Sequence, residues 1–103
     1  MAAPSAPASP VLRPGPEPQS LWVYGNDVAT ATYYNCYLDP ATGVAAAQYK
    51  MQQKCTTGEV PSWLIRNIPF WGKVFVTLTA FNVDDEESTA ATENSIAGSQ
   101  IGG

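Results

Sequence analysis

The residues best suited to chemistry in this 103-residue chain are four consecutive carboxylates, Asp84 to Glu87, and two cysteines, Cys36 and Cys55. Clustered carboxylate oxygens can bind calcium, and a pair of carboxylates can hydrolyse a glycosidic bond. The run lacks the Asp-x-Asp-x-Asp-Gly spacing of a calcium loop. A short turn also offers no cleft for a sugar. We therefore expect a solvated acidic turn, with a metal site or a glycosidase pair as the alternatives.

No histidine occurs in the chain. Ser-His-Asp and Cys-His nucleophiles, His-ligated zinc and imidazole acid-base catalysis are therefore excluded. No glycine-rich phosphate loop and no Cys-x-x-Cys pair is present either. We expect a protein that is not an enzyme and that carries no cofactor.

The two cysteines allow a single disulfide. The N-terminal residues have neither the positive nor the apolar region of an export signal, so a reducing compartment is the expectation. We predict two free thiols, with Cys36 as a small core residue. A disulfide that joins a strand to a neighbouring loop is the alternative.

Composition favours one folded domain, because 45% of the residues are hydrophobic and only 14% are charged, against a usual share of about 25%. The formal net charge is −4, and the five basic residues are scattered along the chain. Phosphate binding needs clustered cations, so we expect no direct nucleic-acid partner. No apolar run is long enough to span a membrane, and no membrane partner is expected.

The N-terminal segment is rich in proline, with six of the nine prolines in its first 18 residues. Such a segment cannot propagate a helix and favours an extended, polyproline-like course. We predict an arm over residues 1–18, in which residues 10–12 could form a first edge strand. A floppy leader is the alternative.

From residue 20 onward the pattern is typical of β-strands. Short aromatic and β-branched runs at 20–24, 30–38, 62–66 and 73–82 are separated by turn residues, and 88–96 can close the sheet. Residues 45–51 fit a helix or a strand, and 55–61 fit a loop. In the clearest run, Val74, Val76, Leu78 and Ala80 alternate with residues of the other face. Six or seven such strands predict an antiparallel β-sandwich over 19–97, with a tail at 98–103.

Residues 62–96 resemble the second half of a fibronectin type III domain. An aromatic-aliphatic alternation is followed by a strand of inward aliphatic residues that ends at asparagine, and then by a Glu-Ser turn. The matching residues are Trp63, Ile65, Ile68, Val74, Val76, Leu78, Ala80, Asn82, Glu87 and Ser88, with Trp22 and residues 34–37 matching earlier strands. The resemblance covers roughly residues 9 to 97 and implies an all-β, immunoglobulin-like sandwich of about seven strands.

Two departures from that family fall near one corner of the sandwich. Val74 stands where the family has a tyrosine, and Pro-Phe-Trp-Gly at 69–72 replaces its Pro-Gly-Thr run. The phenol that pins this corner is therefore missing. We expect packing of Phe70 or Trp71 to take its place.

The alternation of residues 73–82 sets Phe75 and Phe81 on the face opposite the core residues. Tyr33, Asn35 and Tyr37 on the neighbouring strand would extend that face, and exposed aromatic clusters mark interaction surfaces. A reversed register, or a loop that covers the face, is the alternative.

A single module of this kind with an extended arm resembles small virion proteins of tailed bacteriophages, such as capsid decoration or cement proteins and head or tail accessory proteins. This resemblance implies a structural protein of the virion, assembled in the host cytoplasm, that binds the major capsid protein or another multimeric virion protein. Contacts between its own copies are also open. The candidate partner-binding residues are Pro4, Pro7, Pro10, Leu12, Pro14, Phe70, Trp71, Phe75 and Phe81. The alternative is a carbohydrate- or surface-binding module of a larger adhesive or secreted protein, whose outward aromatic rings would stack on a ligand.

Overall fold

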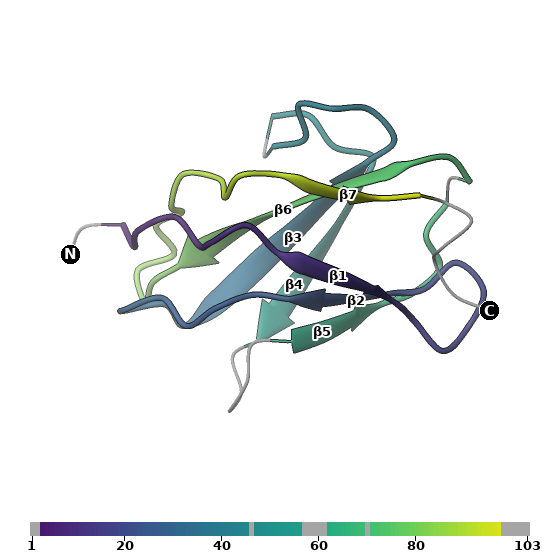
Figure 1. The fold of residues 1–103 in the computed structure, drawn as a ribbon. Helices are drawn as coiled ribbons and strands as arrows, with labels where there is room; N and C mark the ends of the chain where they lie inside the picture. The colour runs from purple at the N-terminus through teal and green to yellow at the C-terminus, as the bar shows by residue number, and fades with distance from the viewer. Residues whose placement is uncertain (1–2, 46, 57–61, 70, 98–103) are drawn as a thin grey trace.

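The computed structural model describes residues 3–45, 47–56, 62–69 and 71–97, which form seven β-strands in two sheets. One sheet has the order β1-β2-β5, with β1 at Val11–Pro14, β2 at Leu21–Tyr24 and β5 at Ser62–Ile65. The other has the order β4-β3-β6-β7, with β4 at Met51–Thr56, β3 at Tyr33–Asp39, β6 at Val74–Phe81 and β7 at Asn94–Ile96. Every pairing is antiparallel, and the sheets stack as a sandwich (Figure 1). Within the described ranges, no helix is long and apolar enough to cross a membrane.

The core between the sheets is built by alternation along the strands. The four aliphatic residues expected to point inward from β6 are fully buried, so the predicted register is confirmed. They pack in one cluster with residues of β2, β3 and β5, which include Leu21, Val23, Tyr34, Cys36, Leu38 and Ile65. Burial of a large aliphatic side chain stabilises the fold by roughly 1.5–3 kcal/mol.

Both cysteines are free, as predicted, and Cys36 is the expected core residue. Cys55, which was expected in a loop, is buried as well. Cys36 lies on β3 opposite Gln53, and Cys55 lies on β4 opposite Tyr34. Burial raises the pKa of the Cys55 thiol to about 12 and raises that of Cys36 well above its usual value, helped by the nearby Cys55. Both sulfurs are therefore core groups that stay protonated at neutral pH.

Two predicted segments differ from the structure. The described residues of 45–51 contain neither a helix nor a long strand. Ala45 and Gln48 form an isolated antiparallel bridge, and the strand begins at Met51 and continues to Thr56. The closing strand expected at 88–96 is reduced to β7 at its end. Earlier in that segment, the backbone N–H groups of Ser88 and Ala91 donate to carbonyls of β6, so irregular chain covers the edge there.

More of the N-terminal segment packs on the sandwich than the sequence indicated. β1 starts at Val11, so the domain begins within the predicted arm of residues 1–18. Leu12 is a core residue, and Pro4, Pro7 and Pro10 are buried against the rest of the chain. These four side chains are turned toward the chain's own sandwich, so a partner can contact them only if the arm lifts away. The predicted tail at 98–103 lies outside the described residues.

Among the described residues, Gln19 holds the corner before β6. Trp71 is 77% exposed, so it does not replace the missing tyrosine, and Phe70 lies outside the described residues. The Gln19 side chain donates to the Ile68 carbonyl at 2.9 Å, and the Ile68 N–H donates to the Gln19 carbonyl at 3.0 Å. This pair of hydrogen bonds ties the corner to the segment before β2.

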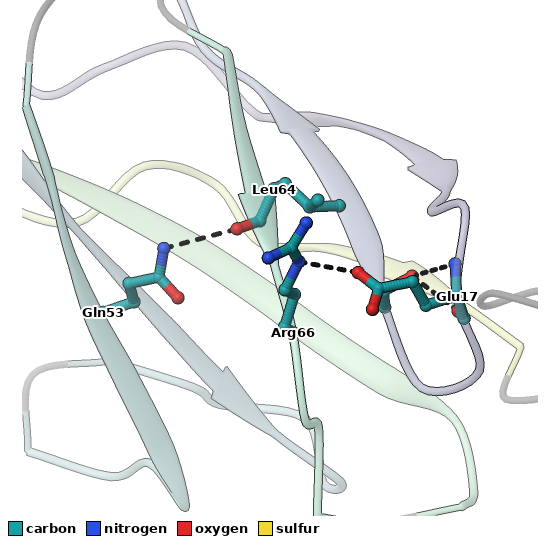
Figure 2. A network of polar contacts seen from close by, with 5 residues as sticks. Glu17, Gln53, Leu64 and Arg66 are labelled. Atoms are coloured by element: carbon teal, nitrogen blue, oxygen red, sulfur yellow. Dashed lines mark hydrogen bonds and ion pairs between the residues drawn. The ribbon is translucent and has the colours of Figure 1, made fainter.

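The open side of the sandwich, where β4 and β5 face each other from different sheets, is closed by two side chains. The Gln53 amide donates to the Leu64 carbonyl at 3.4 Å (Figure 2), and the Trp63 indole donates to the Thr56 carbonyl at 2.8 Å. Figure 2 also shows the ion pair between Arg66 and the Glu17 carboxylate. Both side chains are at least half exposed, so this ion pair contributes little to the stability of the fold.

Candidate binding surface

The outer face of the four-stranded sheet carries the aromatic residues that the sequence singled out. Tyr33 lies beside Phe81 in the register of β3 and β6, and Asp39 lies beside Phe75. Phe75 and Phe81 are half-buried on the side opposite the core residues of β6. Their outward orientation is therefore confirmed.

The middle of this face is covered by a neighbouring segment, so the alternative of a covering loop holds for this part of it. Thr77 donates to the Ala91 carbonyl at 2.6 Å, and Thr79 donates to the Glu87 carboxylate at 2.7 Å. Both threonines are fully buried under the segment that follows β6. Phe75 and Phe81 lie near opposite ends of β6, about 20 Å apart at ~3.3 Å per residue. The covering segment therefore separates the two phenylalanines on this face.

The acidic turn after β6 organises this covering segment. Glu87 accepts hydrogen bonds from Thr79 and from the Tyr37 hydroxyl, and Asp85 accepts one from the Tyr33 hydroxyl at 2.9 Å. Burial, together with the bond to Glu87, raises the pKa of Tyr37. In the parts of the chain that the structure describes, no group of three or more residues could hold a metal ion. Asp85 and Glu87 thus accept separate hydrogen bonds. Glu87 holds the covering segment to the sheet and is not simply a solvated turn residue as expected.

The accessible part of the outer face lies over β3 and β4. The rings of Tyr33 and Phe81 stack with centroids 4.6 Å apart and planes at 6°, and the Lys54 ammonium sits 4.3 Å above the Tyr33 ring. Beside this stack, the Asn35 amide donates to Gln52 at 2.8 Å. We call this surface the β3–β4 face and define it by Tyr33, Asn35, Tyr49, Gln52, Lys54 and Phe81.

Hydrogen bonds continue along the β3–β4 face and fix its side chains. The Gln52 amide donates to the Tyr49 hydroxyl at 3.0 Å, and the Tyr49 ring packs on Tyr37 at 5.1 Å. Tyr49 is still 38% exposed. Because these rings and amides are already held by contacts with one another, they would lose little conformational freedom on binding a partner. This lowers the entropic cost of forming a complex.

Three residues of the β3–β4 face were missed from the sequence: Tyr49, Gln52 and Lys54. All three lie on β4 or just before it, in a region where residues 45–51 were expected as helix or strand, 55–61 as loop, and 52–54 were left unassigned. The sequence does contain a pattern that predicts this strand, because Gln52, Lys54 and Thr56 alternate with inward residues. Gln53 makes the inward face partly polar as well, which hides the alternation of polar and apolar residues.

The remaining predicted site residues do not join this surface. Trp71 lies exposed on the connection between β5 and β6, near the start of β6 and hence nearer Phe75 than Phe81 in the chain. Lys73 sits above the Phe75 ring at 5.4 Å. Pro14 is exposed at the end of β1, in the other sheet. Of the candidate partner-binding residues that the structure describes, Phe81 alone lies on the β3–β4 face. Tyr33 and Asn35, which the sequence also placed outward, lie there with it.

Comparison with known proteins identifies the fold. No protein-family model and no curated protein matches the sequence. Among solved structures, FN3tt superimposes with a TM-score of 0.70 at 19% identity, over 94% of this chain and 96% of that one. A Fn3-like protein from Clostridium thermocellum gives 0.72 at 15% identity, over 91% and 92%. The Clostridium perfringens spore cortex lytic enzyme SleM gives 0.64 at 14% identity, over 94% of this chain but 29% of that chain. The chain therefore has the fibronectin type III fold, which occurs both alone and as one module of larger proteins.

Proposed function

We propose that this chain, a single fibronectin type III fold, is a non-catalytic binding module that contacts a protein surface through its β3–β4 face. The observation that carries the proposal is the stack of Tyr33 on Phe81, capped by Lys54 and flanked by fixed amides. Tyrosine and tryptophan rings supply most of the contact energy in protein interfaces, while amides adapt their hydrogen bonds to the partner.

The charge on this face supports a protein partner. Lys54 is held over an aromatic ring, and the carboxylates of Asp85 and Glu87 are engaged by tyrosine hydroxyls at its border. The face therefore presents few free charges that would need to be stripped of water on association.

For the partner we propose a multimeric protein of a tailed-bacteriophage virion, with the chain acting as a capsid decoration protein or a head or tail accessory protein. This part rests on an analogy of organisation, because a single module with an extended arm resembles small virion proteins. A shell presents many copies of one binding site, so modest contacts by each module can add up on the particle. The protein would then be located in the virion after assembly in the host cytoplasm.

Co-sedimentation of the purified chain with tailed-bacteriophage particles tests the proposal. Tyr49 and Tyr24 form a matched pair, because they are 38% and 36% exposed but lie on different sides of the sandwich. We expect Tyr49→Ala to weaken binding by about tenfold, the loss of one good contact, and Tyr24→Ala to leave it unchanged. Equal effects of the two substitutions would show that the β3–β4 face is not the binding surface. Absence of binding to any particle would show that the partner is not a virion protein.

A second candidate function is carbohydrate binding. The Trp71 side chain is 77% exposed and offers a flat surface on which a sugar ring can lie, and SleM, a spore cortex lytic enzyme, contains the same fold. A glycan array distinguishes the two candidates. Selective binding that is lost in Trp71→Ala favours the carbohydrate module, and a blank array together with particle binding favours the protein partner.

A further inference from the structure

The arm before β1 has a burial pattern with a period of three. Pro4, Pro7 and Pro10 are buried, whereas every residue between them is exposed. None of residues 3–10 belongs to a strand. A polyproline II helix has three residues per turn, so prolines at this spacing form one ridge along it. The sandwich covers that ridge and leaves the other two sides of the arm in solvent.

Two asparagine side chains from different parts of the fold hold the arm by its backbone. Asn26, after β2, accepts a hydrogen bond from the Ala8 N–H at 2.8 Å, and Asn94, in β7, donates to the Pro10 carbonyl at 2.9 Å. In Figure 1 the arm runs alongside the segment that leads into β7. Buried prolines along one side of an extended segment, together with polar side chains that bond its backbone, are features of the surfaces that recognise proline-rich chain. We call the surface that covers Pro4, Pro7 and Pro10 the groove.

We infer that this groove is a binding site for a proline-rich segment with proline at every third position, and that the arm of a second copy of this chain can fill it in exchange for the chain's own arm. The inference is independent of the β3–β4 face, since the groove lies at the other edge of the sheet, beside β7.

The arm is well suited to exchange. Its described hydrogen bonds to the domain outside the strands come from the two asparagines, whereas β1 is held by a ladder of four residue pairs to β2. The arm can therefore lift while β1 stays in place. Its prolines keep it extended when it is free, so little conformational entropy is lost on docking again. The groove would make the same contacts with the arm of another copy as it makes with its own arm. This equivalence is the condition for domain swapping, in which two copies exchange an identical segment.

The first experiment uses the full chain with its own arm weakened by Pro4→Ser and Pro7→Ser, and a synthetic peptide of residues 1–10 as the probe. We expect the peptide to shift the NMR signals of the Asn26 and Asn94 side-chain amides with saturation. The unaltered chain should need about tenfold more peptide, because its own arm competes for the groove.

A peptide of the same composition with prolines at irregular spacing is the control. Ala6→Ser, at an exposed position of the arm, is the matched control in the protein. The inference is wrong if the peptide shifts neither asparagine, or if the control peptide acts equally well.

The second experiment asks whether another copy supplies the arm. A spin label is attached through Ser5→Cys in the otherwise natural chain, and this chain is mixed with the isotope-labelled arm-weakened variant. The natural cysteines are buried and will not take the label. We expect the signals of Asn26 and Asn94 in the isotope-labelled copy to broaden selectively. If the free peptide binds but no such broadening occurs at millimolar protein, the second copy is excluded as the ligand.

Discussion

The hydroxyl of Tyr34 joins β3 to the turn that follows β2, and its removal gives a quantitative test of the fold. Tyr34 is only 1% exposed, and its ring packs on Trp63 at 5.1 Å. The hydroxyl accepts a hydrogen bond from the Val28 N–H at 2.9 Å and donates to the Asn26 carbonyl at 3.1 Å. Tyr34→Phe keeps the ring and its packing but leaves both backbone groups without this partner.

Each lost hydrogen bond costs about 0.5–1.5 kcal/mol, so Tyr34→Phe should lower the free energy of unfolding by roughly 1–3 kcal/mol. For a domain of this size, each kcal/mol lowers the melting temperature by about 4–8 °C. Urea denaturation followed by tryptophan fluorescence measures the change, with an unaltered dependence on urea concentration expected. Because Asn26 also holds the arm through Ala8, hydrogen exchange at the Ala8 amide should become faster.

Tyr24→Phe is the matched control for this test. Tyr24 lies on the outer face of β2 and is 36% exposed. Removal of an exposed hydroxyl should change stability by less than about 0.5 kcal/mol. If Tyr34→Phe is no more destabilising than Tyr24→Phe, the two hydrogen bonds do not contribute as argued.

Four other substitutions or conditions test further parts of the structure. Gln19→Ala removes the side-chain bond to Ile68 and should cost about 1 kcal/mol in urea denaturation; no loss would show that the corner before β6 is held otherwise. Thr30 has a positive φ of 66°, which is unfavourable for a β-branched residue, so Thr30→Gly should stabilise the domain by about 0.5 kcal/mol, and a lower melting temperature would contradict this. The pKa of Cys55 is raised from 9.0 to about 12, so stability should fall as the pH rises through this interval, because the unfolded thiol loses its proton first. At pH 8 a thiol reagent should label Cys36 and Cys55 only after unfolding, and rapid labelling of the native protein would contradict their burial.

The sequence predicted the sandwich where one physical rule dominated. In β6, strict alternation of aliphatic residues decides both the strand and its buried face. β4 was not predicted as a strand because its inward face contains Gln53 between Met51 and Cys55, and this half-buried glutamine reaches across to the Leu64 carbonyl of β5. A contact between two sheets cannot be deduced from the local pattern of one strand.

The binding surface was predicted in part for the same reason. The outward register of Phe75 and Phe81 followed from the alternation, but the burial of Thr77 and Thr79 depends on where the segment after β6 returns. Hydroxyls that bond to a crossing loop have no signature in their own strand. The stack on Tyr33 likewise needs the order of the strands in the sheet.

The two strands nearest the chain ends, β1 and β7, run in the same direction and lie in different sheets (Figure 1). If the chain were pulled from both ends, β1 would be drawn backward along β2 while β7 was drawn forward along β6. Hydrogen bonds between antiparallel strands lie across the strands, so mechanical force would load each ladder in shear. The four residue pairs of β1 with β2 and the three of β6 with β7 would resist together, rather than open one after another. The fold is therefore arranged to carry tension along its length.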